Sequence, residues 1–238
     1  MPKIESTGST ATKAAAADAA LAIPVWDVPI RLFHWTLVAL IAFSWWSAEN
    51  GRAEWHIWSG LALMSLLLFR LFWGFFGSST ARFGSFVRGP RAILDYARNP
   101  RIWGEVGHTP LGALSVVALL GLLSVQVGLG LVLSDEDGTV TAPLNRFVSF
   151  NTAEWAHDLH ELLFNVLLGF IALHVAAILF YRLVLGKRLL GSMITGRTQA
   201  VGAAQPMRPA RWWTAVLCLL AAIAITRWVI AGAPPFGT

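Results

Sequence analysis

Two histidines, His160 and His174, lie fourteen residues apart within one apolar stretch of the chain. In an α-helix, fourteen steps of about 100° and 1.5 Å return to within about 40° of the same face and advance about 21 Å. Neutral imidazole is a ligand for transition metals and haem iron, and it also carries protons. One helix therefore offers two imidazoles on one side, at two depths, for metal-ligand or proton chemistry.

The helix that carries these histidines belongs to a chain with the composition of a membrane protein. Of 238 residues, 56% are hydrophobic and 13% are charged, and the mean hydropathy is +0.61. Five apolar runs are long enough to cross a hydrocarbon layer, which takes about 20 residues. They cover residues 30–46, 56–76, 111–133, 159–183 and 212–231. We therefore predict an all-α integral membrane protein.

The basic residues alternate with the acidic residues from one connection to the next. Acidic residues outnumber Arg52 and Arg146 in the connections after the first and third spans: Glu49, Glu54, Asp135, Glu136, Asp137, Glu154 and Asp158. Basic residues dominate the connections after the second and fourth spans: Arg82, Arg88, Arg91, Arg98, Arg101, Arg182, Lys187, Arg188, Arg197, Arg208 and Arg211. The positive-inside rule then predicts a cytoplasmic N-terminus and a periplasmic C-terminus. The net charge of +5 is thus a topology signal, and nucleic-acid binding is not expected.

This topology sorts four histidines into two pairs by depth. His34 begins the first span and His174 lies late in the fourth, so both fall in the cytoplasmic half of the membrane. His56 begins the second span and His160 begins the fourth, so both fall in the outer half. A single histidine on an apolar face is often a hydrogen-bonded core residue. Four in two level pairs favour a shared function.

Three kinds of chemistry fit intramembrane histidines. Zinc or copper needs three or four converging ligands, whereas these pairs are about 21 Å apart in depth, so a structural metal cluster is disfavoured. A proton relay usually uses buried acids, and the sequence has none between the two levels. Haem iron takes one imidazole on each side of the porphyrin. The two pairs therefore predict two haems, whose six-coordinate iron is suited to electron transfer.

Two arginines and two further histidines are candidates for the groups around such haems. Arg70 lies fourteen residues after His56 and thus near the cytoplasmic side, where it either snorkels to headgroups or pairs with a buried acid. Arg31 and Arg70 are at the right depth for the propionates of the inner haem. His157 is either a surface residue or a contact at the outer haem edge, and His108 either begins a helix in solvent or lines a quinone pocket.

The residues named above, together with their neighbours, resemble the bacterial and nickel-hydrogenase type of the cytochrome b561 family. Members of this family are b-type dihaem membrane cytochromes. The resemblance covers about residues 23–196. The matching motifs are Val25-Trp26-Asp27 with Arg31 and His34-Trp35, His56, Gly107-His108-Thr109-Pro110-Leu111-Gly112, and His157-Asp158-Leu159-His160-Glu161 with His174.

The resemblance implies two haem b groups held by His34, His56, His160 and His174. His157 is the competitor of His160 for the outer haem. Seventeen residues separate His157 from His174, which places it about 100° off the helix face of His174, so His160 is preferred. The resemblance also implies electron exchange between the quinone pool and a partner outside the membrane. In this family the partner is a hydrogenase, a c-type cytochrome or, in some members, superoxide.

Together these features predict a four-helix transmembrane haem-binding bundle over residues 23–196, preceded by a disordered cytoplasmic tail (1–22). A linker and a fifth transmembrane helix follow (197–238). The expected location is the bacterial inner membrane, in contact with lipid, and a homo-oligomer is compatible with these features. The main hypothesis is an electron carrier between quinone and a periplasmic redox protein. A superoxide:quinone oxidoreductase and a non-redox transporter or proton channel are the alternatives.

Overall fold

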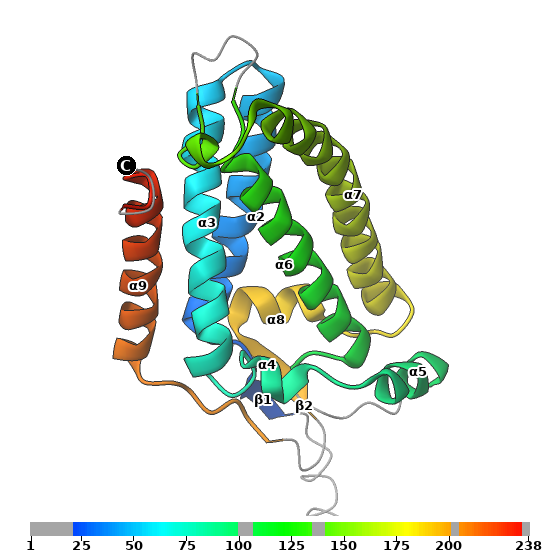
Figure 1. Ribbon diagram of the computed structural model, residues 1–238. Helices are drawn as coiled ribbons and strands as arrows, with labels where there is room; N and C mark the ends of the chain where they lie inside the picture. Colours follow the sequence, from blue (N-terminus) through cyan, green and yellow to red (C-terminus); the bar gives the residue numbers. More distant parts are fainter. Residues whose placement is uncertain (1–20, 100–106, 135–140, 201–204, 235–238) are drawn as a thin grey trace, which may run out of the picture.

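The computed structural model describes residues 21–99, 107–134, 141–200 and 205–234 (Figure 1). Five long helices form the body of the molecule: α2 (Val28–Glu49), α3 (Ala53–Phe76), α6 (Pro110–Gly130), α7 (Phe150–Leu183) and α9 (Trp212–Ile230). All five are long and apolar enough to cross a membrane. The predicted all-α membrane fold with five spans is confirmed.

Short elements cluster at one end of these helices. They are β1 (Leu21–Pro24), α4 (Phe83–Phe86), α5 (Pro90–Arg98), α8 (Leu189–Thr195) and β2 (Arg197–Ala200). Figure 1 shows all of them at the bottom of the bundle. Because the two basic connections run through them, we call this the arginine-rich end. The opposite end holds the turn between α2 and α3, the 3-10 helix η1 (Asn145–Phe147) and the last described residues, and we call it the acidic end.

Local signals explain where the helices begin. The Asp27 side chain accepts a hydrogen bond from the Ile30 backbone N–H at 2.7 Å, and Pro29 occupies the first turn of α2. Thr109 caps α6 in the same way, accepting from Gly112 N at 3.1 Å. The α7 helix starts at Phe150, nine residues before the predicted span, because Ser149 caps it outside the apolar run. Side-chain oxygens at these positions satisfy backbone donors that the helix leaves free.

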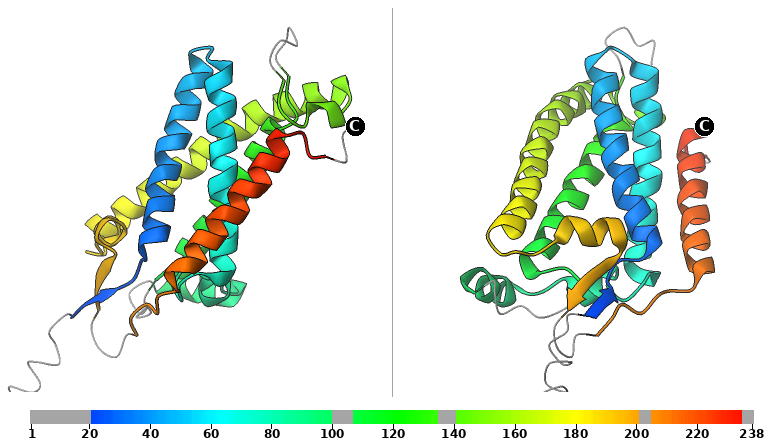
Figure 2. Two further views of the ribbon diagram at one scale, coloured as in Figure 1. Left: turned by 90° about the vertical axis from the view of Figure 1, so that its left-hand side faces the viewer. Right: turned by 180° about the vertical axis from the view of Figure 1, so that it is seen from behind.

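The helices pack in two antiparallel pairs, α2 with α3 and α6 with α7, and α3 also contacts α6. The fifth span, α9, lies along α3 (Figures 1 and 2). Ser65 of α3 donates to Thr226 of α9 at 2.8 Å, and Ala222 of α9 is fully buried. Figure 2 shows that α9 covers α3 on the side away from α6 and α7.

The two flanks of the four-helix bundle are joined at the arginine-rich end. Strand β1 pairs with β2 in antiparallel register, from Leu21 opposite Ala200 to Pro24 opposite Arg197. Leu21 and Ala22, which the prediction assigned to the tail, therefore belong to a strand, and residues 1–20 lie outside the described part of the chain. Arg101 and the acidic residues 135–137 lie outside it as well. The pairing holds the segment before α2 against the segment after α8.

Candidate cofactor-binding site

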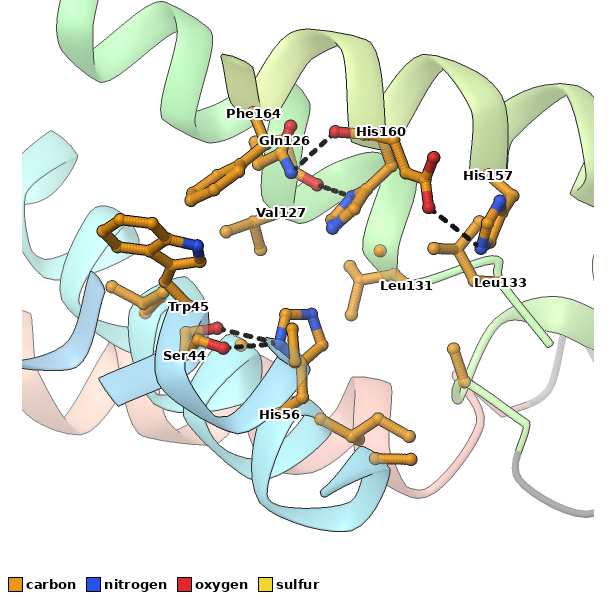
Figure 3. Close-up of a pocket in the computed structure, with 18 of the residues that line it drawn as sticks. Ser44, Trp45, His56, Gln126, Val127, Leu131, Leu133, His157, His160 and Phe164 are labelled. Atoms are coloured by element: carbon orange, nitrogen blue, oxygen red, sulfur yellow. Dashed lines mark hydrogen bonds and ion pairs between the residues drawn. The ribbon is translucent and has the colours of Figure 1, made fainter. Parts of the chain in front are cut away.

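A cavity of about 900 Å³ opens between α2, α3, α6 and α7 at the acidic end (Figure 3). This volume is near the top of the range of about 300–1,000 Å³ for small-molecule and cofactor pockets. His56 of α3 and His160 of α7 extend into the cavity from opposite sides (Figure 3). Its other walls are mainly apolar and include Ile41, Leu61, Leu63, Leu123, Val127, Leu131, Phe164 and Leu167.

Both cavity histidines are held through the same ring nitrogen. His56 Nδ1 lies 2.9 Å from the Ser44 carbonyl oxygen, with the Ser44 hydroxyl at 3.2 Å. His160 Nδ1 lies 3.0 Å from the Gln126 carbonyl oxygen. Because a carbonyl only accepts, each Nδ1 must carry the proton and donate it. The Nε2 atoms are therefore left with free lone pairs, as is required of metal ligands.

The two imidazoles face each other across a gap that fits one metal ion. Their ring centroids are 6.0 Å apart and their planes are nearly perpendicular, at 82°. Two metal–nitrogen bonds of about 2 Å, plus about 1 Å from each nitrogen to its ring centre, separate the centroids by about 6 Å. The absence of a side chain at Gly130 makes room for His160, since a Cβ there would lie 3.3 Å from His160 Cε1. The spacing fits a single metal ion, such as a haem iron, which His56 and His160 would hold between them.

The second histidine pair is closer to the arginine-rich end. The imidazoles of His34 in α2 and His174 in α7 are near enough for their charges to interact. His174 Nδ1 lies 3.2 Å from the Ser115 hydroxyl of α6, whereas buried His34 Nδ1 has no hydrogen-bond partner among the described residues. His34 and His174 therefore lie near each other, as do His56 and His160. In the described part of the chain, no three His, Cys, Asp or Glu side chains group to hold a metal ion.

Arg70 is buried at the arginine-rich end. Its side chain is 3% exposed, so it does not snorkel. Nη1 has no hydrogen-bond partner and no ion pair joins Arg70 to another described residue. The guanidinium lies 4.7 Å from the centre of the Phe83 ring, and the nearby carboxylate of Asp27 is used by Ile30 N and Trp73 Nε1. A buried cation with a free donor is suited to an anionic group such as a propionate.

His108 lies next to Arg70 and is packed between aromatic rings. Its ring centroid is 4.6 Å from Trp26 and 4.3 Å from Phe86. Nδ1 is buried without a hydrogen-bond partner among the described residues. Burial and, to a smaller extent, the charge of Arg70 lower the pKa of His108 to about 3. The imidazole is therefore neutral at physiological pH, and it does not lie in solvent at the start of α6.

The other two predicted site residues lie at the margins. Arg31 donates to the carbonyl oxygen of Ile194 at 2.5 Å, at the end of α8. Gly196 lies against it with φ 77°, a conformation that favours glycine. His157 is half-exposed at the mouth of the cavity, with Nε2 4.0 Å from Glu161 Oε1 (Figure 3).

Sequence reasoning gave no role to the residues that orient the histidines. Ser44, Ser115 and Gln126 are polar residues inside apolar spans, and this is the signal that could have found them. Gln126 is 7% exposed, and its side-chain amide donates to the His160 carbonyl at 3.0 Å. Paired interactions of this kind are what a buried polar residue in a membrane helix needs.

A membrane-spanning helical bundle in which two oriented imidazoles face each other across an apolar cavity has the architecture of a b-type cytochrome. The family model for prokaryotic cytochrome b561 matches residues 25–196. The chain therefore belongs to the prokaryotic cytochrome b561 family, and it is a haem b-containing membrane electron carrier. No significant similarity to a curated protein or to a solved structure was found.

Proposed function

We propose that the chain binds two haem b groups and carries electrons across the bilayer between the quinone pool and a periplasmic redox protein. The outer pair of ligands is His56 and His160, and the inner pair is His34 and His174. The observation that carries this proposal is the outer pair, whose rings lie 6.0 Å apart with both Nδ1 atoms bonded to carbonyls. When bound, each group supplies a one-electron iron couple.

The proposed orientation places the arginine-rich end in the cytoplasm, as the positive-inside rule predicts. Buried Arg70 would then neutralise a propionate of the inner haem, and Arg31 lies at a similar depth. The quinone would exchange electrons at this end, near His108, whose Nδ1 is buried and free of described partners. Its low pKa leaves a neutral ring that can donate or accept one hydrogen bond.

The acidic end suits a basic protein partner. Glu49 and Glu161 line the cavity around the outer histidine pair, and no lysine or arginine is among the described lining residues. Glu54, Glu154 and Asp158 are exposed nearby. Such a surface would steer a positively charged partner, for example a c-type cytochrome or a basic face of a hydrogenase, toward the outer haem edge.

The same acidic rim opposes the superoxide alternative. Superoxide is an anion, and a rim of carboxylates raises the electrostatic cost of its approach. Steady reduction of quinone by superoxide with the purified protein alone would support that alternative. We expect no turnover until a basic redox protein is added.

A reduced-minus-oxidised absorption spectrum with haem quantitation tests the proposal. We expect two haems per chain, with one lost in His160→Ala and the other lost in His174→Ala. His157→Ala is the matched control, because it changes a histidine of the same helix at the cavity mouth and should keep both haems. One haem per chain would overturn the two-site proposal, and loss of a haem in His157→Ala but not in His160→Ala would overturn the ligand assignment.

A further inference from the structure

The two histidine pairs differ in what holds their Nδ1 atoms. In the outer pair, both donate to backbone carbonyls, at 2.9 Å and 3.0 Å. In the inner pair, His174 meets only the weaker Ser115 hydroxyl at 3.2 Å, and His34 has no partner among the described residues. A strong acceptor at Nδ1 makes an imidazole a more basic ligand. A more basic ligand stabilises ferric over ferrous iron, so this difference lowers the reduction potential of the outer site.

The charges around the two pairs also differ. Glu49 and Glu161 line the outer cavity. At the inner level, α2 and α3 are antiparallel neighbours, so the backbone positions of Arg70, nineteen residues after Gly51, and His34, seventeen before it, lie within about 3 Å along the helices. The Asp27 carboxylate is near the Arg70 guanidinium and offsets part of its charge. Arg31 is a second cation at this end, so these three side chains together leave a net positive charge. Negative charge favours ferric iron and positive charge favours ferrous iron.

Both differences act in the same direction. We propose that the inner site has the higher reduction potential, an inference that rests on the function proposed above. Arg70, Ser115 and Glu161 are the positioning residues that set the order of the two reduction potentials. An electron from the reduced periplasmic protein, which is thereby oxidised, then passes downhill to the inner site. Two such electrons and two protons from the cytoplasm convert one quinone to one quinol.

A potentiometric titration of the purified full-length protein, followed at the haem absorption bands, tests this order. We expect two one-electron steps, of which the lower survives in His174→Ala. Arg70→Gln should lower the upper midpoint and leave the lower one in place. A unit charge at about 10 Å in a medium of effective dielectric constant about 20 changes the equilibrium roughly tenfold, which is about 59 mV for one electron. Arg70→Lys keeps the positive charge and should therefore have the upper midpoint of the wild-type protein, unlike Arg70→Gln.

Further variants keep the test decisive if Arg70→Gln does not fold. Ser115→Ala should raise the upper midpoint alone, because His174 loses its acceptor. Glu161→Gln should raise the lower midpoint alone. Glu154→Gln is its matched control, since Glu154 is an exposed acid of the same helix outside the cavity lining, and it should move neither step.

Two results would overturn the inference. One is survival of the upper step in His174→Ala. The other is that Ser115→Ala does not move the upper midpoint and Glu161→Gln does not move the lower midpoint, or that each variant moves the other midpoint instead. A failure of the proposed function is distinguishable, because haem quantitation before the titration would then show fewer than two haems per chain.

Discussion

Replacing Gly130 by alanine should weaken cofactor binding at the outer site without weakening the fold. A Cβ at this position would lie 3.3 Å from His160 Cε1, a few tenths of an ångström inside the optimal carbon–carbon separation of about 3.5–4.0 Å. The His160 ring is held by the carbonyl of Gln126, which lies on α6 like Gly130, so the ring has little freedom to move away. Glycine to alanine within a helix otherwise stabilises by about 0.5–1 kcal/mol.

The two effects separate in two measurements on Gly130→Ala. Disturbing the orientation of a metal-ligating histidine typically costs 10–100-fold in affinity, or about 1.4–2.8 kcal/mol. We therefore expect haem titration of the apoprotein to show one site weakened by about tenfold or more and the other unchanged. The apoprotein itself should be as thermally stable as wild type, or more stable.

Gly128→Ala is the matched control for this experiment. It lies two residues earlier in α6, and a Cβ there meets nothing within 4 Å. It should gain the helical stabilisation and bind haem normally at both sites. Equal haem affinities in the two alanine variants would refute the role of Gly130 in seating His160.

Three further predictions concern the arginine-rich end. A Cβ at Gly74 would overlap the Phe83 ring, so Gly74→Ala should displace α4, lower the unfolding temperature and expose Arg70 to solvent-borne arginine reagents. Tyr96→Phe removes the 2.6 Å hydrogen bond to Tyr181 and should cost about 1 kcal/mol of unfolding free energy, with no loss if the bond is absent in solution. Folding lowers the pKa of His108 from 6.5 to about 3, so the unfolded state binds a proton at this residue more tightly than the folded state does. The part of the unfolding free energy that depends on His108 is therefore constant above about pH 6.5 and decreases as the pH falls, by about 2 kcal/mol at pH 5. His108→Gln should abolish this part of the pH dependence of unfolding, and an unchanged slope would contradict it.

Much of the fold followed from the sequence because membrane insertion imposes simple rules. Length and hydropathy located five spans to within a few residues at most ends, and Asp27 with Pro29 predicted the start of α2. The start of α7 was missed because its first nine residues are amphipathic, so hydropathy does not register them, although Ser149 caps them. The pairing of β1 with β2 was missed because it joins segments about 175 residues apart, a long-range contact that periodicity does not encode.

The meeting of two candidate ligands at the site was predictable from the sequence, and the surroundings of these ligands were less so. The predicted topology placed His56 and His160 at one level, and in the structure their ring centroids are 6.0 Å apart. It could not show that backbone carbonyls orient them, because those contacts depend on how α2 packs on α3 and α6 on α7. Burial of Arg70 without a described partner likewise depends on Phe83, which reaches it from α4 after a change of chain direction.

The depth difference of about 21 Å between the two histidine levels has an energetic consequence for the cell. It spans about two thirds of a hydrocarbon layer of about 30 Å. One elementary charge crossing the whole layer exchanges about 2.3 kcal/mol per 100 mV of membrane potential, so an electron moving between the proposed sites exchanges at most about 1.6 kcal/mol per 100 mV. Inward transfer would make the cytoplasm more negative. The protein would thereby convert part of the redox energy into membrane voltage, and the voltage in turn would slow it.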